Sequence, residues 1–582
     1  MDVNGTTSLL RDPNYLRWVQ FSIAEENATR QPSTGTDNLD NIKRRAHRSG
    51  NSDLSSLSGS NPRARKLKED SFTDVKYDMD RTDRKQHNHD QIPNADRVNE
   101  ICRDNGRTSK ETQDACTIAS DYIKNEIDKM GLNANCVDIY PAYKPNERNK
   151  IYFVITLTDI SIEIEKRFRQ CIKYPYVLKK MYSSSDECSE VQREASTLPS
   201  TYDRELQKCL EKMSPVLMEK HAYLSIVTGS EIKSKGFQGP NHVKFKRKCI
   251  QLFVHAKGYI PLAEEVFANS YGDYDTDILE GTFQPFANEH ANERQRVLTL
   301  GCKIMRSGFR SDFFQLREKK VHGTLGGFVD HPEYGFCGFS CAHVLLNKNE
   351  IEKAERDKRI YYPTLNESVF QPVDGPDGDR IGFLVEAMYK EKHDDDKRAG
   401  VELALFSVDK RIPRKGTFPS LPSSQFRKTF NSGNTIGPTL AKGRRVWKFG
   451  CTSQYTEGFI HGMTSSVRTQ PFSYMTPIKQ ITLFNQLEVS SGVHGKTFAQ
   501  QGDSGALVFK DTLGDEEPVC VGMVVGGSGL DARNSSCQTF VTPIREILEA
   551  LNVKHLKVFH SGIIHDEIRN NSEDYREILN YM

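Results

Sequence analysis

The spacing of apolar residues divides the chain into regions of different character. Residues 31–100 contain nine Ile, Leu, Val or Met residues and two aromatic residues, Phe72 and Tyr77, so they bury too little apolar area to offset the entropy of ordering. We therefore predict that residues 1–111 form a mostly disordered polar region. Within it, the aromatic segment 15–21 is a candidate for docking on a protein partner.

Helical and strand periodicities begin near residue 112. Ala119, Ile123 and Ile127 recur at helical spacing, and Gly131 offers a C-cap. Further predicted elements alternate downstream, with helices at 162–172 and 206–217 and strands at 136–140, 151–157, 243–245 and 249–254. This order predicts an α+β module at 112–295, either one unit or two similar subdomains. The sequence does not reveal its function, and it is a second candidate surface for a protein partner.

The region from 296 to 555 is rich in short strands separated by turn signals such as Asp374-Gly375 and Gly526-Gly527. Long helical patterns are rare there until 544–551, which has the apolar spacing of a helix. We predict an all-β domain at 296–555 that ends in a C-terminal helix, followed by a polar tail at 556–582.

Length and charge limit the classes of protein that fit. At 582 residues the chain is too long for one core, which predicts a multidomain protein. The formal net charge of +2 indicates no nucleic-acid partner. No apolar run reaches the roughly 18 residues of a spanning helix, and residues 1–20 lack the apolar core of a signal peptide. We therefore expect no membrane partner.

The cysteines and the charged runs do not predict a metal site. The 13 cysteines are scattered, and Cys337 and Cys341 lack a second pair of ligands that would complete a zinc set. The acids at 273–277 fit an acidic surface loop better than a calcium site. We expect no metal and no cofactor. The basic clusters at 43–45 and 63–68 fit either a nuclear-import signal or a solvated run.

Two short motifs in the strand-rich region contain candidate catalytic residues. Ser504 stands in Gly502-Asp503-Ser504-Gly505 before an apolar strand, and His343 stands between small residues and an apolar run. A serine hydroxyl becomes a good nucleophile when a neighbouring base takes its proton. Glycine permits a turn whose backbone N–H groups point at a developing oxyanion.

These motifs, with strand patterns at 323–329, 446–453 and 521–528, resemble the trypsin/chymotrypsin-like serine peptidases over residues 300–552. The resemblance implies an all-β double Greek-key barrel. It implies that His343 is the base, that Ser504 is the nucleophile, and that the N–H groups of Gly502 and Ser504 form the oxyanion hole. It also implies that Asp503 is a buried structural acid.

The third triad member departs from this family, which carries an aspartate where the chain has Glu402. A carboxylate there orients the histidine and stabilises its protonated form, and glutamate does so in some α/β-hydrolases. Glu402 is therefore the predicted acid. Asp396 is a fallback, in a run that also fits a solvated loop. Because glutamate is one methylene longer, a weakened or inactive protein stays an alternative.

The resemblance places the floor of the specificity pocket at Phe498 and the substrate-binding strand at Gly526 and Gly527. An aromatic residue at the pocket floor argues against selectivity for Arg or Lys. It also indicates that the pocket is shallow. Val344 and Gln500 stand where secreted members carry disulfide cysteines. This departure favours an intracellular setting, in the cytoplasm or the nucleus.

We therefore predict a serine endopeptidase that acts on a polypeptide through His343, Glu402 and Ser504 and needs no cofactor. Two alternatives stay open. One is a weak or inactive protein that binds peptides as a scaffold. The other is a peptidase that processes itself, with cleavage between residues 31 and 112 releasing the catalytic domain.

Overall fold

The structure is a computed structural model that describes residues 92–559, all within one compact unit. The description leaves out residues 133–134, 197–201, 238–241, 287–293, 307–321, 363–366, 373–378, 393–397, 420–427, 438–442, 472–479, 493–496, 513–515 and 529–537. The predictions for residues 1–91, for Asp396 and for the tail from residue 560 onward lie outside the described residues.

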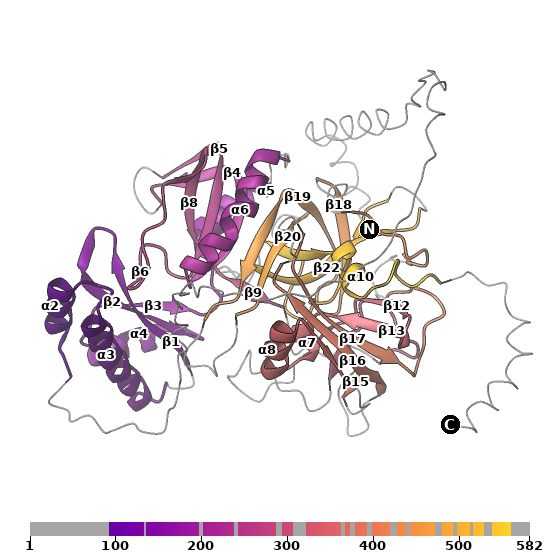
Figure 1. The fold of residues 1–582 in the computed structure, drawn as a ribbon, viewed down its shortest axis with the longest axis horizontal. Coiled ribbons are helices and arrows are strands. Elements are labelled where there is room, and N and C mark those ends of the chain that lie inside the picture. Colours follow the sequence, from indigo (N-terminus) through magenta and orange to yellow (C-terminus); the bar gives the residue numbers. More distant parts are fainter. Residues whose placement is uncertain are drawn as a thin grey trace, which may run out of the picture. The chain divides into compact units, whose positions relative to one another are not determined.

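The first described part is a four-stranded sheet with three helices (Figure 1). Its helices are α2 (Ala95–Asn105), α3 (Lys110–Lys129) and α4 (Ile162–Cys171), and its strands are β1 (Cys136–Lys144), β2 (Glu147–Leu157), β3 (Tyr176–Lys180) and β6 (Ile260–Pro261), in the order β3-β2-β1-β6. Ser109 caps α3 by accepting the Thr112 N–H. The predicted helix–strand module is confirmed, but it begins at α2, upstream of residue 112. We missed α2 because its only buried residues are Val98 and Cys102.

A second part repeats the same arrangement. Its elements are α5 (Asp186–Ser196), α6 (Arg204–Lys220), β4 (Leu224–Lys235), β5 (Val243–Val254), β7 (Ser270–Tyr271) and β8 (Tyr274–Glu280). In both parts a helix precedes an antiparallel hairpin, and a third strand then pairs in parallel with the second strand of that hairpin. Residues 274–277 belong to β8, so the expected acidic loop is corrected to a strand. Asp277 is buried there and accepts the Ser234 N–H.

The strand-rich region begins with an eight-stranded sheet in the order β11-β10-β15-β16-β17-β13-β12, with β14 on β16. Its strands are β10 (Lys303–Arg306), β11 (Gly323–Thr324), β12 (Gly327–His331), β13 (Gly335–Ser340), β14 (Arg359–Tyr361), β15 (Ser368–Phe370), β16 (Arg380–Lys390) and β17 (Val401–Val408), with the helices α7 (Ala342–Leu345) and α8 (Lys348–Asp357). The end strands β11 and β12 are consecutive, so one extended stretch pairs with β10 on one side and β13 on the other. This connection brings the two edges of the sheet together.

The following strands form a ring of six. They are β18 (Arg445–Gly450), β19 (Gln454–Arg468), β20 (Thr482–Ser491), β21 (Leu507–Lys510), β22 (Val519–Ser528) and β23 (Thr539–Pro543). Their order is β18-β21-β22-β23-β20-β19, and β19 pairs back with β18, which closes the ring. Helix α10 (Ile544–Ala550) follows directly, which confirms the predicted C-terminal helix.

The ring is also continuous with the second α/β part, which we predicted to end before residue 296. Strand β4 pairs with β19 through Val227 and Ser466, and the short strand β9 (Phe283–Pro285) pairs with β22. The boundary at 295/296 therefore does not separate two sheets. The sequence did not indicate these pairings because strand periodicity says nothing about which distant strand is the partner.

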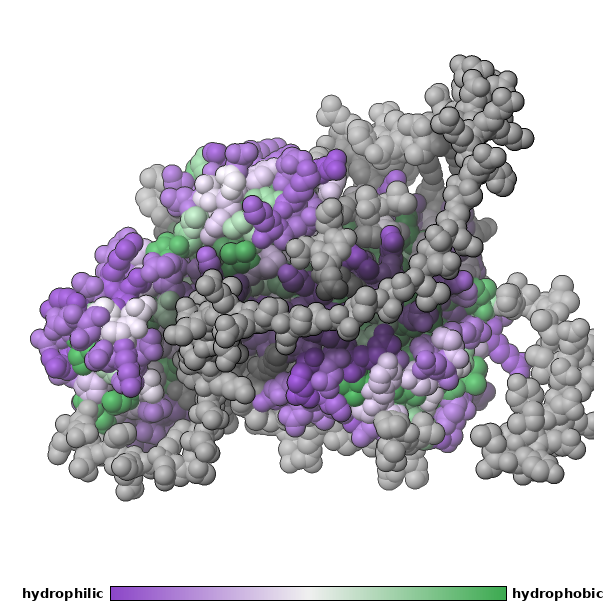
Figure 2. Space-filling model, viewed as in Figure 1, coloured by the Kyte–Doolittle hydropathy of each residue, from purple (hydrophilic) through white to green (hydrophobic). Residues whose placement is uncertain are grey.

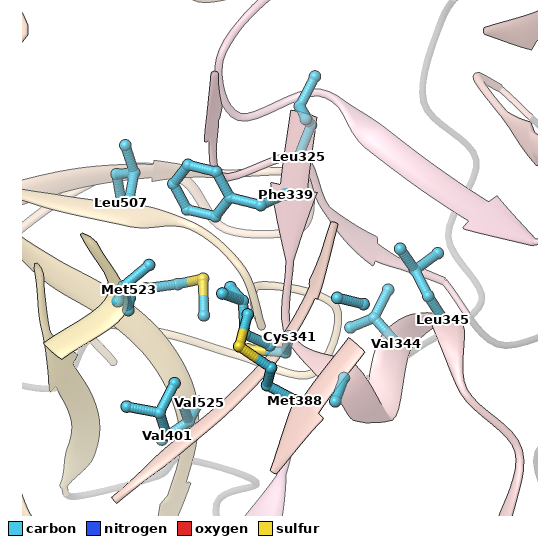
Figure 3. Packing of buried hydrophobic residues seen from close by; sticks show 14 of the residues in the cluster. Leu325, Phe339, Cys341, Val344, Leu345, Met388, Val401, Leu507, Met523 and Val525 are labelled. Carbon is cyan, nitrogen blue, oxygen red and sulfur yellow. The ribbon is translucent and has the colours of Figure 1, made fainter. Parts of the chain in front are cut away.

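One large apolar cluster joins the eight-stranded sheet to the ring. Leu507, Met523 and Val525 of the ring lie close to Phe339 and Cys341 of the sheet (Figure 3). All five side chains are at most 3% exposed. This shared core fixes the end of β13, and therefore His343, relative to the turn before β21.

The surface carries few large apolar areas on the face drawn in Figure 2, where hydrophobic residues show only as small separate groups. Within the described part of the chain, no helix is both long and apolar enough to cross a membrane.

Candidate active site

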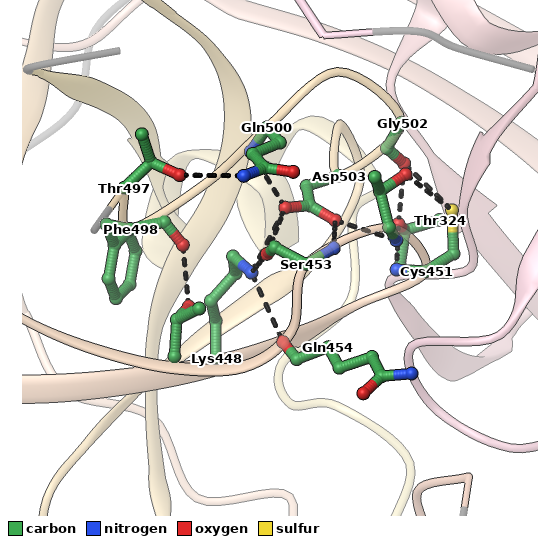
Figure 4. Close-up of polar contacts among 12 residues, drawn as sticks. Thr324, Lys448, Cys451, Ser453, Gln454, Thr497, Phe498, Gln500, Gly502 and Asp503 are labelled. Carbon is green, nitrogen blue, oxygen red and sulfur yellow. Dashed lines mark hydrogen bonds and ion pairs between the residues drawn. The ribbon is translucent and has the colours of Figure 1, made fainter. Parts of the chain in front are cut away.

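The turn that holds Ser504 is built around a buried carboxylate. Gly502 has φ +101°, and a Cβ on it would lie 2.0 Å from Thr452 Oγ1, so only glycine fits. Asp503 is fully buried and accepts hydrogen bonds from four backbone or side-chain donors (Figure 4). These donors are the N–H groups of Thr452 (3.0 Å), Ser453 (3.1 Å) and Gln500 (2.9 Å) and the Ser453 hydroxyl (2.5 Å). Asp503 is therefore fully occupied in holding the turn.

A buried lysine supplies the positive charge for this carboxylate. Lys448 Nζ lies 3.2 Å from Asp503 Oδ2, and both side chains are 0% exposed. The ammonium also contacts Ser453 Oγ at 2.5 Å and Gln454 O at 3.3 Å. Burial lowers the pKa of Lys448, and the negative charge of Asp503 opposes that shift. Sequence reasoning missed Lys448, which reads there as one polar position in an apolar strand.

The structure brings His343, Glu402 and Ser504 together. His343 lies on α7, directly after β13; Glu402 is the second residue of β17; Ser504 precedes β21. His343 Nδ1 lies 2.5 Å from Glu402 Oε1, and its Nε2 lies 2.8 Å from Ser504 Oγ. Since an ionised carboxylate can only accept, Nδ1 carries the proton and leaves Nε2 free to accept the serine proton. A second bond, from the His343 backbone N–H to Glu402 Oε2 at 3.0 Å, fixes the carboxylate.

Cys341, His343 and Glu402 place three potential metal ligands within 4.8 Å of one another. Burial raises the pKa of the Cys341 thiol well above its ordinary value, so the thiol stays protonated, and it donates to Val524 O at 3.2 Å. Both ring nitrogens of His343 already contact Glu402 and Ser504. The three residues therefore fit a hydrogen-bonded triad better than a metal centre, which needs a thiolate and a free imidazole nitrogen.

A segment of the chain itself lies against Ser504. The Ser504 N–H donates to Phe286 O at 3.2 Å, and the Phe286 N–H donates to Ser504 Oγ at 3.1 Å. Strand β9, which precedes Phe286, pairs antiparallel with β22. Phe286 was not among the predicted site residues. The only signal in the sequence was the short extended run Phe283-Gln284-Pro285-Phe286 before a polar stretch.

The predicted pocket residues lie around this segment. Gly526 and Gly527 of β22 pair with Pro285 and Gln284. The Phe286 side chain is 0% exposed and belongs to the same buried apolar cluster as Phe498. The Phe286 ring is therefore buried in the same cluster as the residue predicted for the pocket floor, and the shallow pocket stays a prediction. Phe498 is itself packed close to Gly458, where a Cβ would lie 2.7 Å from its ring.

No protein-family model and no curated protein sequence matches the chain. Solved structures of serine proteases match over part of it. A glutamic-acid-specific serine protease, described as using a novel histidine triad in substrate binding, matches at 15% identity and a TM-score of 0.26 over 44% of this chain and 100% of that one. Thermobifida fusca Protease A matches at 13% identity and a TM-score of 0.25 over 45% and 99% of the two chains. Cellulomonas bogoriensis chymotrypsin matches at 15% identity and a TM-score of 0.25 over 45% and 98%. The chain is structurally similar to chymotrypsin-like serine proteases over about 45% of its length.

Proposed function

We propose that the protein is a serine endopeptidase with a trypsin-like fold, in which the eight-stranded sheet and the six-strand ring are the two Greek-key barrels. One observation carries the proposal: the His343 ring contacts a buried carboxylate of Glu402 with one nitrogen and the Ser504 hydroxyl with the other. A histidine held in this way is arranged to take a proton from the serine.

In the proposed reaction, Ser504 Oγ attacks the carbonyl carbon of a peptide bond while His343 Nε2 takes the hydroxyl proton. Glu402 keeps the ring in the productive tautomer and stabilises the imidazolium that forms. The N–H groups of Gly502 and Ser504 hold the developing oxyanion. His343 then gives its proton to the leaving amine, and water releases the acyl group in a second round. No step requires a metal or cofactor.

Labelling with a fluorophosphonate probe tests this function, because the probe reacts with a serine that its base activates. We expect the wild-type protein to be labelled, Ser504→Ala to lose all labelling, and Glu402→Gln to be labelled far more slowly. Ser183→Ala is the matched control, since that hydroxyl donates to Lys180 O on an exposed turn. A folded wild-type protein that is not labelled would favour the peptide-binding scaffold instead.

We also propose that the protein works in a reducing, intracellular compartment on polypeptide substrates. No disulfide joins any two cysteines within the described part of the chain, and buried Cys341 and Cys520 lie near the site. Secreted domains of this size usually use such positions for disulfides. Retention of activity in millimolar reductant is the expected result, and inactivation by reductant would contradict it.

A further inference from the structure

We propose that this peptidase cleaves its own chain after Phe286, with Phe283–Phe286 bound in the active site as an intramolecular substrate. The inference rests on the proposed function. It adds to that function a substrate, a cleavage position and a preference for an aromatic residue before the cut.

The backbone of the segment is bound as an added strand. Phe283, Gln284 and Pro285 pair antiparallel with Ser528, Gly527 and Gly526 of β22. Main-chain pairing of an extended peptide with an open strand gives affinity without depending on the side chains. Gly526 allows the approach, because a Cβ there would lie 2.5 Å from Gln284 O.

The carbonyl oxygen of Phe286 contacts one of the two N–H groups that we propose for the oxyanion hole. Its oxygen accepts the Ser504 N–H at 3.2 Å, and the amide of the same residue is 3.1 Å from Ser504 Oγ. These two contacts place the backbone of Phe286 directly beside the nucleophile, with the carbonyl oxygen toward the Ser504 N–H. The same Oγ is 2.8 Å from His343 Nε2 and 3.2 Å from Val525 O, so the base, the nucleophile and the Phe286 carbonyl are neighbours.

The pocket selects the side chain before the cut. The Phe286 ring is fully buried in an apolar cluster that includes Ile460, Val489, Phe498 and Val524. The nearby ammonium of Lys448, 5.7 Å from the centroid of the Phe498 ring, is paired with Asp503. Burying a phenyl ring is favourable by about 2 kcal/mol, whereas a charged side chain there would lose its hydration.

Upstream contacts hold the segment in place. The Phe283 N–H donates to Ser225 Oγ at 2.8 Å, and that hydroxyl donates to Arg468 O at 2.7 Å. The Phe283 ring lies edge-on to Phe540, with 5.7 Å between ring centroids. Since β4 and β19 carry these anchors, the segment is presented at the high effective concentration of an intramolecular ligand.

The proposed step balances as ordinary peptide hydrolysis. The Ser504 Oγ–carbon bond forms as its proton passes to His343, and the bond from Phe286 to the nitrogen of the next residue, Ala287, breaks as that nitrogen receives the proton. Water then attacks the ester, giving a Phe286 carboxylate and free Ser504. The products are residues 1–286 and 287–582. Cleavage here differs from the predicted position between residues 31 and 112.

The test is intact-mass and N-terminal analysis of the full chain purified as wild type and as Ser504→Ala. We expect Ser504→Ala to remain one chain of 66.2 kDa and the wild type to give fragments that end at Phe286 and begin at Ala287. An uncut wild-type chain, or a chain cut elsewhere, would overturn the proposal. Mixing tagged Ser504→Ala with wild type tests whether the cut is intramolecular, and rapid cutting of the tagged chain would contradict that.

Two variants separate the pocket from general folding. Phe286→Asp should slow the cut about 100-fold, since a charged group enters an apolar pocket. Phe245→Asp is the matched control, because Phe245 is 44% exposed on β5, and it should be cut at the wild-type rate. Phe286→Tyr should still be cut. If Phe286→Asp is cut as fast as wild type, the pocket assignment fails.

A separate substrate distinguishes failure of this inference from failure of the proposed function. The peptide Phe-Gln-Pro-Phe p-nitroanilide carries the same four residues before a reporter amine. If a wild-type chain that stays whole turns it over, the protein is a peptidase and self-cleavage is wrong. If the wild-type chain stays whole and neither the peptide nor a fluorophosphonate reacts with it or with Gly526→Ala, in which the new Cβ displaces β9 from the site, both proposals are wrong.

Discussion

Glu402 contacts His343 twice, through the ring Nδ1 at 2.5 Å and through the backbone N–H at 3.0 Å. The two carboxylate oxygens thus divide their roles, one orienting the ring and the other holding the carboxylate itself. The additional methylene of glutamate is accommodated by this second bond, with Glu402 1% and His343 3% exposed. A glutamate in this position is therefore held by one contact from each of its two oxygens.

Replacing Glu402 by Gln should lower kcat by about 10³- to 10⁴-fold with little change in KM, because an amide cannot stabilise the imidazolium and favours the wrong tautomer. Steady-state kinetics on the Phe-Gln-Pro-Phe substrate measure this. Glu402→Asp keeps the charge but shortens the side chain, and should retain more activity than Glu402→Gln. Equal losses in both variants would show that geometry rather than charge is what Glu402 provides.

Replacing Lys448 by Met should destabilise the ring, because it leaves Asp503 buried without a cation. Breaking a buried pair in this way costs about 3–5 kcal/mol. Urea unfolding followed by tryptophan fluorescence measures the change, since Trp447 is adjacent and buried. Lys208→Met is the control, as Lys208 and its partner Glu205 are 53% and 69% exposed, and it should leave stability unchanged.

Replacing Gly526 by Ala should displace strand β9, because the new Cβ would lie 2.5 Å from Gln284 O and 2.6 Å from the Phe283 ring. We expect self-cleavage to slow by at least about 10-fold and KM for the added peptide to rise, since both use this strand edge. Time courses of fragment formation measure the first effect. Gly437→Ala, where a Cβ meets nothing within 4 Å, should behave as wild type.

The α/β region should lose stability in mild acid through His255. Burial lowers the pKa of His255 to about 3, and its ring contacts the hydroxyls of Tyr140 (3.4 Å) and Thr156 (3.5 Å). The unfolded chain therefore takes up a proton below about pH 6.5 that the folded chain takes up only near pH 3, so stability rises with pH across that window. Between pH 7.5 and 5.5 the loss should be about 1.4 kcal/mol.

Hydrogen exchange of the β1–β2 amides at the two pH values measures this loss. His255→Gln, which does not titrate, should remove most of the difference, although it lowers stability at both pH values. A variant that keeps the full wild-type difference would assign the pH dependence to another group.

The sequence could predict the three residues of the candidate site because each stands in a local motif. His343, Glu402 and Ser504 are flanked by small residues and apolar strands, and the same patterns predicted the strand-rich region and its last helix. Lys448 and Phe286 do not stand in a comparable sequence motif. Their importance comes from Asp503 and Ser504, which meet them only after folding, and the repeated hairpin arrangement of the two α/β parts likewise lies in strand pairing and not in repeated residues.

The Lys448–Asp503 pair holds the turn around Ser504 in the uncleaved chain. Lys448 lies on β18 and Asp503 lies in the turn before β21, so neither charge of the pair that holds this turn comes from a chain end. Cleavage after Phe286 would then leave the turn around Ser504 unchanged and alter only the segment that is bound in the active site. Maturation would then consist of releasing β9 from β22, so that the active site becomes open to other substrates.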